Sequence, residues 1–302
     1  MSINKGIINL IKPVGITSFQ AVKEVKKIIN VKKAGHTGTL DLLATGVLPI
    51  CFGRATKVIQ YLNETKKEYI AEITIGKTTE TLDREGKIVS KTNKWRSLTD
   101  IEIKEVVNSF IGEIKQIPPM YSAVHHNGKR LYKLARKGKE VKREPRNITI
   151  FYIEILKIDL PIIKLKIGCS KGTYIRALAK DIGDKLKVGA YLSFLIRTKS
   201  GPFDIEEAIT FKEIKKNINN LDEFVSSLDF FLDYPSLNIK PESEKRAVNG
   251  VALREYDFVN EIKDYKKGNL ILIYGPDNKF ISINKVDTED NEIIIKPERV
   301  FV

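Results

Sequence analysis

Strand-like and helix-like segments follow one another without regular alternation along this chain of 302 residues. Residues 69–75 place an apolar side chain at every second position, the period of a half-buried strand. Further apolar segments of strand length occupy residues 6–12, 47–52, 148–158 and 162–168. Apolar side chains recur at helical spacing over residues 18–29, 101–110 and 174–186. The irregular order predicts an α+β fold with a mixed, largely antiparallel sheet flanked by helices.

Three local features refine this prediction. Ser18 is expected to cap the first helix, because a serine side chain can accept a hydrogen bond from the helix backbone. Residues 56–62 look helical. Residues 35–46 look too polar and too interrupted by glycine for a regular element.

A break near residues 233–241 divides the chain, because Pro235 and Pro241 flank a short polar segment. Beyond it, short strand-like segments alternate with turn formers, which is typical of a small barrel. These segments are residues 251–253, 270–274, 280–286 and 293–295. We therefore predict a larger α+β domain over residues 1–232 and a small all-β domain over residues 233–302.

The chain is strongly basic. Its 52 Lys and Arg residues exceed its 38 Asp and Glu residues, which gives a formal net charge of +14. Such a surplus favours a polyanionic partner, most often a nucleic acid, although a Lys-rich composition alone could produce it. An anionic membrane is a weaker alternative, because no apolar run is long enough to span one.

An insertion over about residues 115–147 concentrates this positive charge, and it also contains Tyr121 and Tyr132. Cationic side chains interleaved with aromatic ones are suited to RNA, although a solvated loop could have the same composition. The residues that we expect to bind RNA are Lys129, Arg130, Lys133, Arg136 and Arg143.

Cysteine is sparse, and Cys51 and Cys169 lie far apart and outside any metal-ligand spacing. The sequence therefore predicts neither a disulfide framework nor a metal site. The N-terminal residues lack the pattern of a signal peptide, so we expect a reducing, cytoplasmic setting.

The segment with the clearest chemical potential is residues 35–46, GHTGTLDLLATG, where three glycines and three threonines surround Asp41. A glycine-rich backbone can approach a ligand closely. From the residues alone, Asp41 could be a nucleophile, a general base, a metal ligand or a turn residue, and a turn residue is the commonest of these. A metal is disfavoured because only His36 is near, and the segment lacks the ending of a phosphate-binding P-loop.

Several further segments occur in a set order. They are residues 12–18 (KPVGITS), 53–57 (GRATK), 118–123 (PPMYSA) and 171–176 (KGTYIR). Together with residues 35–46 they resemble the bacterial tRNA pseudouridine-55 synthases, the TruB-type family of pseudouridine synthases. The resemblance runs through about Thr198 and continues more weakly beyond it. One departure is Leu42, which stands where the family usually has a proline that would stiffen the loop.

The resemblance implies a catalytic group of three residues. Asp41 matches the family's nucleophile, Tyr69 its base-stacking tyrosine, and Arg176 the arginine that pairs with the catalytic carboxylate. A carboxylate suits this role because an ordinary aspartate is ionised near neutral pH. Conversion of uridine to pseudouridine gains and loses no group, so no cofactor is expected.

The resemblance also implies a surrounding group of substrate-binding residues. Tyr174 and Leu195 match positions that line the uracil pocket, and His36 matches a residue that contacts RNA near the flipped base. Asp83 matches an acidic position that helps to hold the arginine. We also expect Lys57 to bind substrate. The C-terminal domain resembles an RNA-binding domain of the PUA type.

The implied reaction isomerises uridine 55 in the T-arm loop of tRNA, by a monomer without an obligatory protein partner. Flipping the base out of its stack costs a few kcal/mol, and stacking on one aromatic ring returns about 1–3 kcal/mol. Net affinity must therefore come from phosphate contacts, which the insertion could supply. Two alternatives remain at this point: a non-catalytic RNA-binding or remodelling protein on the same scaffold, and a pseudouridine synthase with another RNA target.

Overall fold

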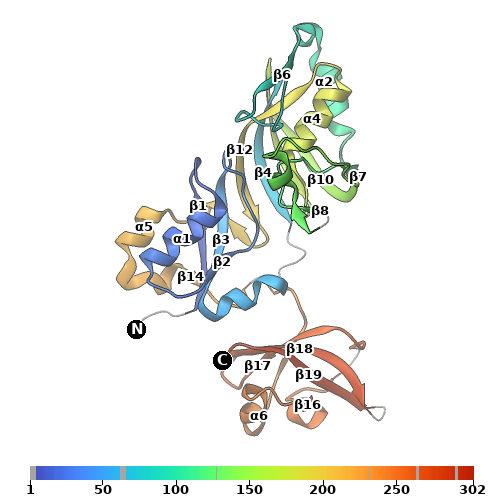
Figure 1. Cartoon of the computed structure of the whole chain (residues 1–302). Coiled ribbons are helices and arrows are strands. Elements are labelled where there is room, and N and C mark those ends of the chain that lie inside the picture. Colours follow the sequence, from blue (N-terminus) through green and yellow to red (C-terminus); the bar gives the residue numbers. More distant parts are fainter. Residues whose placement is uncertain (1–4, 62–65, 127, 231, 263–264, 290–291) are drawn as a thin grey trace.

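The computed structural model describes residues 5–61, 66–126, 128–230, 232–262, 265–289 and 292–302 (Figure 1). Its larger part is built on a ten-stranded sheet, with the main order β14-β1-β3-β12-β4-β11-β10-β7. These strands are β14 (Val225–Ser226), β1 (Gly6–Lys12), β3 (Thr45–Phe52), β12 (Ala190–Ser200), β4 (Lys67–Ile75), β11 (Ile162–Cys169), β10 (Arg146–Asp159) and β7 (Gly112–Gln116). Two short strands, β2 (Ala34–His36) and β13 (Phe203–Asp204), pair with β3 and β12.

The sheet is antiparallel except at one place. There β3 and β12 run parallel, and the parallel register joins Ile196 to Thr45 and Arg197 to Gly46. This short pairing forms a seam between the part of the sheet that contains β1 and the part that contains β4. The mixed, largely antiparallel sheet confirms the α+β prediction.

Helices cover one face of the sheet. They are α1 (Ser18–Ile28), α2 (Asp100–Asn108), α4 (Ile175–Lys185) and the short α5 (Phe211–Lys216). Their apolar stripes and the inward side chains of β4 share one core, in which Val25, Ile103, Leu178 and Ile73 are each completely buried. The predicted two-residue period of β4 and the three predicted helices are therefore confirmed, because each buries its apolar face in this core.

Two local predictions were wrong and one was confirmed only in part. The N-cap of α1 is Thr17, whose side chain accepts a hydrogen bond from Gln20 in a capping box, whereas Ser18 turns inward. The helical prediction for residues 56–62 is confirmed in part: the described residues of this segment form no α-helix but two short 3₁₀ helices, η1 (Gly53–Lys57) and η2 (Ile59–Tyr61), separated by Val58. The start of the glycine-rich segment forms β2, which pairs with β3.

The remaining small elements lie mostly on the connections. They are β5 (Lys77–Thr79), β6 (Ile88–Lys91), β8 (His125–His126), β9 (Lys129–Arg130), α3 (Leu131–Ala135), η3 (Lys94–Ser97), η4 (Ile205–Glu207) and η5 (Ile218–Phe224). Of these, β8, β9 and α3 build the basic insertion. Among the helices of the described residues, none combines the length and the apolar character that crossing a membrane requires.

The C-terminal part is a curled five-stranded half-barrel (Figure 1, orange to red). Its order is β15 (Ser236–Asn238), β17 (Leu270–Tyr274), β18 (Phe280–Glu289), β19 (Glu292–Val300) and β16 (Leu253–Arg254). An isolated bridge between Ile239 and Phe258 links the two ends of this order. The short α6 (Glu244–Val248) and the turns η6 (Pro241–Ser243) and η7 (Glu255–Asp257) complete it.

The half-barrel shares an apolar core with the back of the large sheet. Ile7 of β1 and Cys51 of β3 belong to the same buried cluster as Leu272, Ile283 and Phe301 of the half-barrel. In Figure 1 the light-blue segment that includes η1 lies between the two parts. The carbonyl group of Tyr61 accepts a hydrogen bond from the Tyr234 hydroxyl at 3.1 Å, which fixes the start of the C-terminal part.

Candidate active site

The loop between β2 and β3 presents Asp41, and the side chain of this residue is 36% exposed. Ser18 fixes the residue before it. Its buried Oγ accepts a hydrogen bond from the Leu40 amide at 2.8 Å and donates one to the Leu40 carbonyl at 3.0 Å. The inward turn of Ser18 at the start of α1 therefore holds the loop, and Thr17 is left to cap the helix.

Leu42 follows Asp41, and hydrogen bonds restrain the backbone there. The carbonyl of Leu42 accepts a hydrogen bond from the Gly15 amide at 3.0 Å, and the carbonyl of Asp41 accepts one from the Ala44 amide at 3.1 Å. One hydrogen bond from the segment after β1 and one within the loop thus restrain the backbone around Leu42 in the absence of a proline.

Arg176 lies in the first turn of α4, and its side chain is only 4% exposed. Its Nε donates to Oδ2 of Asp41 at 2.7 Å. The Nη1 atom contacts Oδ2 of Asp83 at 3.5 Å and donates to the Thr81 carbonyl at 3.1 Å. The Nη2 atom donates to the Tyr121 carbonyl at 2.9 Å. A buried guanidinium needs such partners, and here they come from three separate loops.

Asp83 supports this arginine from a turn that is tied to β12. Its neighbours form the backbone hydrogen bonds Leu192 N–Leu82 O and Arg84 N–Leu192 O, at 3.0 and 3.1 Å. The Thr81 hydroxyl donates to the Asp83 carboxylate at 2.5 Å. Burial raises the pKa of the Asp83 carboxyl, and the Thr81 hydrogen bond and the charge of Arg176 only partly oppose this shift.

Tyr69, Tyr174 and Leu195 surround the same region. Tyr69 is 8% exposed on β4, Leu195 is 5% exposed on β12, and Tyr174 directly precedes α4. Burial raises the pKa of both phenols, and the nearby negative charge of Asp41 acts in the same direction. The structure therefore brings together Asp41, Asp83 and Arg176 by direct contact, with both tyrosines close to the carboxylate.

Arg197 is part of this region, although the sequence did not draw attention to it. It is 1% exposed on β12, its Nε donates to the Val47 carbonyl at 2.7 Å, and its Nη2 donates to the Gly38 carbonyl at 3.2 Å. In the sheet register it lies opposite Tyr69. A charged residue inside the apolar stretch of β12 was the signal that could have identified it.

Lys12 was also missed as a functional residue, although it opens the segment of residues 12–18. It is fully buried, and its Nζ donates to the carbonyls of Pro13 and Ile16, each at 2.8 Å. Burial lowers the pKa of Lys12 to about 8, while the negative charge of Asp41 opposes the shift. Lys12 therefore shapes the segment that contacts the Asp41 loop.

His36 and Lys57 lie apart from the carboxylate–arginine contacts described above. His36 is half-buried in β2, and burial, together with the charge of Arg197, lowers its pKa. Lys57 is exposed on η1, in the same turn as Arg54, whose guanidinium bonds to the Val302 carbonyl of the half-barrel. Lys57 thus lies toward the junction with the C-terminal part.

The basic insertion presents its cations unequally. Lys129, Arg130, Lys133 and Arg136 are exposed, and Arg136 lies over the Tyr132 ring at 5.6 Å. Arg143 is instead half-buried: it donates to the Pro118 carbonyl at 3.3 Å and pairs with Glu140 at 3.2 Å. Arg143 therefore ties the base of the insertion together, and its role in binding RNA stays a prediction.

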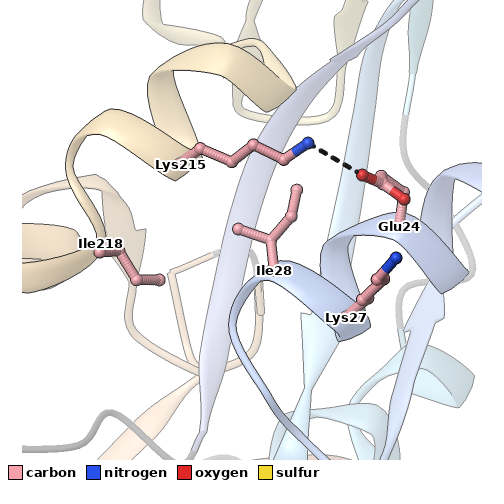
Figure 2. A pocket seen from close by; sticks show the side chains of 5 residues that line it. All are labelled: Glu24, Lys27, Ile28, Lys215 and Ile218. Carbon is pink, nitrogen blue, oxygen red and sulfur yellow. Dashed lines mark ion pairs between the residues drawn. The ribbon is translucent and has the colours of Figure 1, made fainter.

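Two other kinds of site can be compared in the described residues. These residues contain no cluster of three or more His, Cys, Asp or Glu side chains that could hold a metal ion. A groove of about 320 Å³ opens between α1 and α5, where Lys215 pairs with Glu24 beside Ile28 and Ile218 (Figure 2). Its side chains are separate from the contacts of Asp41, and it offers no reactive group.

Proteins in solved structures share this fold. The chain superposes on a protein in the structure of an H/ACA RNP bound to a substrate RNA containing 2′-deoxyuridine, with a TM-score of 0.76 and 28% identity. For a chain of a Cbf5-Nop10-Gar1 complex, the TM-score is 0.77 and the sequence identity is 30%. Each comparison covers 100% of this chain and 86% of the other. The chain therefore shares its overall fold with proteins of these two complexes.

Sequence comparisons identify the family. Residues 26–175 match the TruB family pseudouridylate synthase (N terminal domain), and residues 176–233 match the tRNA pseudouridylate synthase B C-terminal domain. The chain is 45% identical to tRNA pseudouridine synthase B of Clostridium tetani over 96% of this chain and 98% of that protein. The chain is also 47% identical to the Clostridium novyi protein of the same name, over 92% of this chain and 94% of that protein. The chain belongs to the TruB family of pseudouridine synthases, which confirms the resemblance that its motifs indicated.

Proposed function

We propose that the chain isomerises uridine 55 in the T-arm loop of tRNA to pseudouridine, with Asp41 as the covalent nucleophile. The observation that carries this proposal is the 2.7 Å contact between Arg176 Nε and Asp41 Oδ2. A buried arginine in this place pairs with the charge of the carboxylate and fixes its direction. Because Oδ2 is the bound oxygen, we assign the attack to Oδ1.

The reaction balances within the substrate. The bond between N1 of the uracil and C1′ of the ribose breaks, the uracil turns, and a bond forms between C5 and C1′. C5 loses one proton and N1 gains one, so the composition of the nucleotide is unchanged. Asp41 holds the fragment that it attacks, at either C1′ of the ribose or C6 of the base, until the new bond forms.

The side chains around Asp41 are suited to an extruded base. We propose that the uracil stacks on Tyr69 and contacts Leu195 and Tyr174, because the two tyrosines lie near the carboxylate and Leu195 is on the strand next to Tyr69. Stacking on one ring offsets a large part of the few kcal/mol that flipping costs. His36 is proposed to contact RNA beside the flipped base.

The exposed cations of the insertion are proposed to hold the T arm. Lys129, Arg130, Lys133 and Arg136 present positive charge to solvent and lie on the segment that begins beside Arg176. We propose that a monomer acts on tRNA in the cytoplasm, with the half-barrel as a second RNA-binding surface.

The decisive experiment uses an unmodified tRNA transcript. The purified protein is incubated with the transcript, and pseudouridine is mapped chemically along the whole RNA. We expect modification at position 55 alone, and none at that position when its uridine is replaced by cytidine. The Asp41→Asn variant should form no pseudouridine and should bind the transcript within a few-fold of the parent protein. Turnover by Asp41→Asn, or modification elsewhere, would overturn the assignment.

A further inference from the structure

Gln116, the last residue of β7, makes a two-way hydrogen bond to the residue that precedes α4. Its side chain is buried, with 2% exposure. The amide oxygen accepts from the Tyr174 backbone N–H at 2.8 Å, and the amide nitrogen donates to the Tyr174 carbonyl at 3.1 Å. Gln116 thus satisfies both backbone groups of one residue from a distant strand.

This contact lies at a helix start that has no side-chain cap. Tyr174 is the N-cap of α4, but its own side chain makes no capping hydrogen bond. Its carbonyl already accepts the Leu178 amide, which closes the first turn of the helix. A primary amide is suited to the remaining groups, because it offers one donor and one acceptor side by side. Gln116 therefore fixes the position at which α4 begins.

The beginning of α4 determines where Arg176 lies, since this residue follows Tyr174 by two positions. Arg176 bonds to Asp41 through Nε and to the Tyr121 carbonyl through Nη2. Gln116 and Tyr121 belong to one stretch of chain that leads from β7 into the basic insertion. The base of the insertion therefore contacts α4 at two points. Gln116 bonds to the N-cap residue Tyr174, and the Tyr121 carbonyl accepts a hydrogen bond from Arg176.

We propose that Gln116 is a positioning residue. It holds Arg176 against Asp41 and thereby links the base of the basic insertion to the nucleophile. The proposal rests on the function proposed above for Asp41 and Arg176. Gln116 acts through Arg176 and touches no reacting atom. Its loss should therefore slow the chemical step and leave the affinity for RNA nearly unchanged, because a displacement of about 1 Å can cost about 100-fold in rate.

The test compares Gln116→Met and Gln116→Glu with the parent protein. Single-turnover rate constants for pseudouridine formation and dissociation constants for the tRNA transcript are measured between pH 5.5 and 8.5. Gln116→Met, which has a similar size and no hydrogen-bonding amide, should lower the rate constant about 10- to 100-fold at every pH and change the dissociation constant less than three-fold. Glu213→Met removes a cap from α5 in the same way and should leave both quantities unchanged.

Gln116→Glu distinguishes positioning from simple stability. A protonated carboxyl group can donate to the Tyr174 carbonyl and accept from its N–H, whereas an ionised one cannot donate. The rate constant of this variant, relative to the parent protein, should therefore rise as the pH falls. If Gln116→Met does not fold, the pH dependence of the Gln116→Glu rate constant, relative to the parent protein, still tests the proposal. A relative rate constant that does not change with pH contradicts it. A Gln116→Met variant that keeps the parental rate constant, or loses affinity in proportion, also contradicts it. A parent protein that makes no pseudouridine would instead refute the proposed function.

Discussion

Gly46 and Arg197 meet so closely across the seam of the sheet that a Cβ atom on Gly46 would lie 2.2 Å from the Arg197 carbonyl oxygen. Gly46 also has a φ of +101°, in a region that other residues rarely adopt. This approach lets the backbones of β3 and β12 pair in parallel directly after the Asp41 loop, while the Arg197 side chain bonds to Gly38 within the loop.

Gly46→Ala should destabilise the protein severely, because it adds both backbone strain and a clash with main-chain atoms. We expect a loss of about 3 kcal/mol or more in the free energy of unfolding, measured by urea denaturation. Gly112→Ala is the matched control, since Gly112 has a φ of +109° but no heavy atom within 4 Å of its added Cβ. It should cost only about 1–2 kcal/mol. Equal losses in the two variants would contradict the role given to the close approach.

Ser18→Ala should loosen the loop that carries Asp41. The change leaves the buried amide and carbonyl of Leu40 without their partner, which costs about 1–3 kcal/mol in the free energy of unfolding. The rate constant for pseudouridine formation should fall as well. Ser97→Ala, in which an exposed serine is changed, should alter stability by less than about 0.5 kcal/mol. A Ser18→Ala variant with parental stability and rate would show that Ser18 does not restrain the loop.

Lys67 should make stability depend on pH. Its Nζ donates to the Ser200 hydroxyl at 2.9 Å, and burial, followed by the charge of Arg197, lowers its pKa to about 7. Between pH 7 and about 10.5 the unfolded chain binds a proton at Lys67 that the folded chain does not. The free energy of unfolding therefore rises with pH over this range. Below pH 7 Lys67 is charged in the folded protein as well, and the full cost of burying that charge lowers the stability.

Comparison with Lys67→Met isolates this effect, because Lys12 titrates in both proteins. The free energy of unfolding of the parent protein, relative to the variant, should rise by about 2 kcal/mol between pH 6.5 and 9. Urea denaturation at several pH values in this range measures it. A difference that stays constant over the range would show that Lys67 keeps an ordinary pKa.

Neutralising the exposed cations of the insertion should weaken tRNA binding and flatten its salt dependence. The variant Lys129→Ala/Arg130→Ala/Lys133→Ala should reduce the slope of log affinity against log salt by about 2, because each phosphate that the protein neutralises adds about 0.7 to the steepness of this slope. The charge-preserving variant Lys129→Arg/Arg130→Lys/Lys133→Arg is the control and should keep the parental slope. A parental slope in the alanine variant would place the phosphate-binding cations elsewhere.

The features predicted well from sequence are those with a local signal. The period of two in residues 69–75 predicts β4, and the helical spacing after Thr173 predicts α4, because each pattern reports which side chains face the core. The resemblance to the TruB-type family implies that Arg176 pairs with Asp41 and that Asp83 helps to hold it, and both contacts are present. The N-cap was misplaced by one residue because Thr17 and Ser18 have the same capping chemistry, and only the loop at Leu40 decides between them.

The features that were missed depend on interactions between distant segments. β12 lies at the centre of the sheet, yet residues 190–200 show no clean alternation, since the strand has two register irregularities against β4. Gln116 and Arg197 act on backbone groups that lie 58 and 159 positions away in the chain. No window of sequence contains both partners of such hydrogen bonds, so their roles become visible only in the folded chain.

One apolar cluster joins Ile7 and Cys51 of the large sheet to Leu272, Ile283 and Phe301 of the half-barrel. This cluster fixes the position of the half-barrel relative to the large sheet, so the half-barrel is not a flexibly tethered domain. A cut at the Pro235 break would expose apolar side chains on both pieces, so the two parts should melt in a single transition. Any RNA segment that binds the half-barrel therefore lies at a set distance from Asp41. An RNA arm of the wrong length would bind to the protein but would not place its base at the carboxylate.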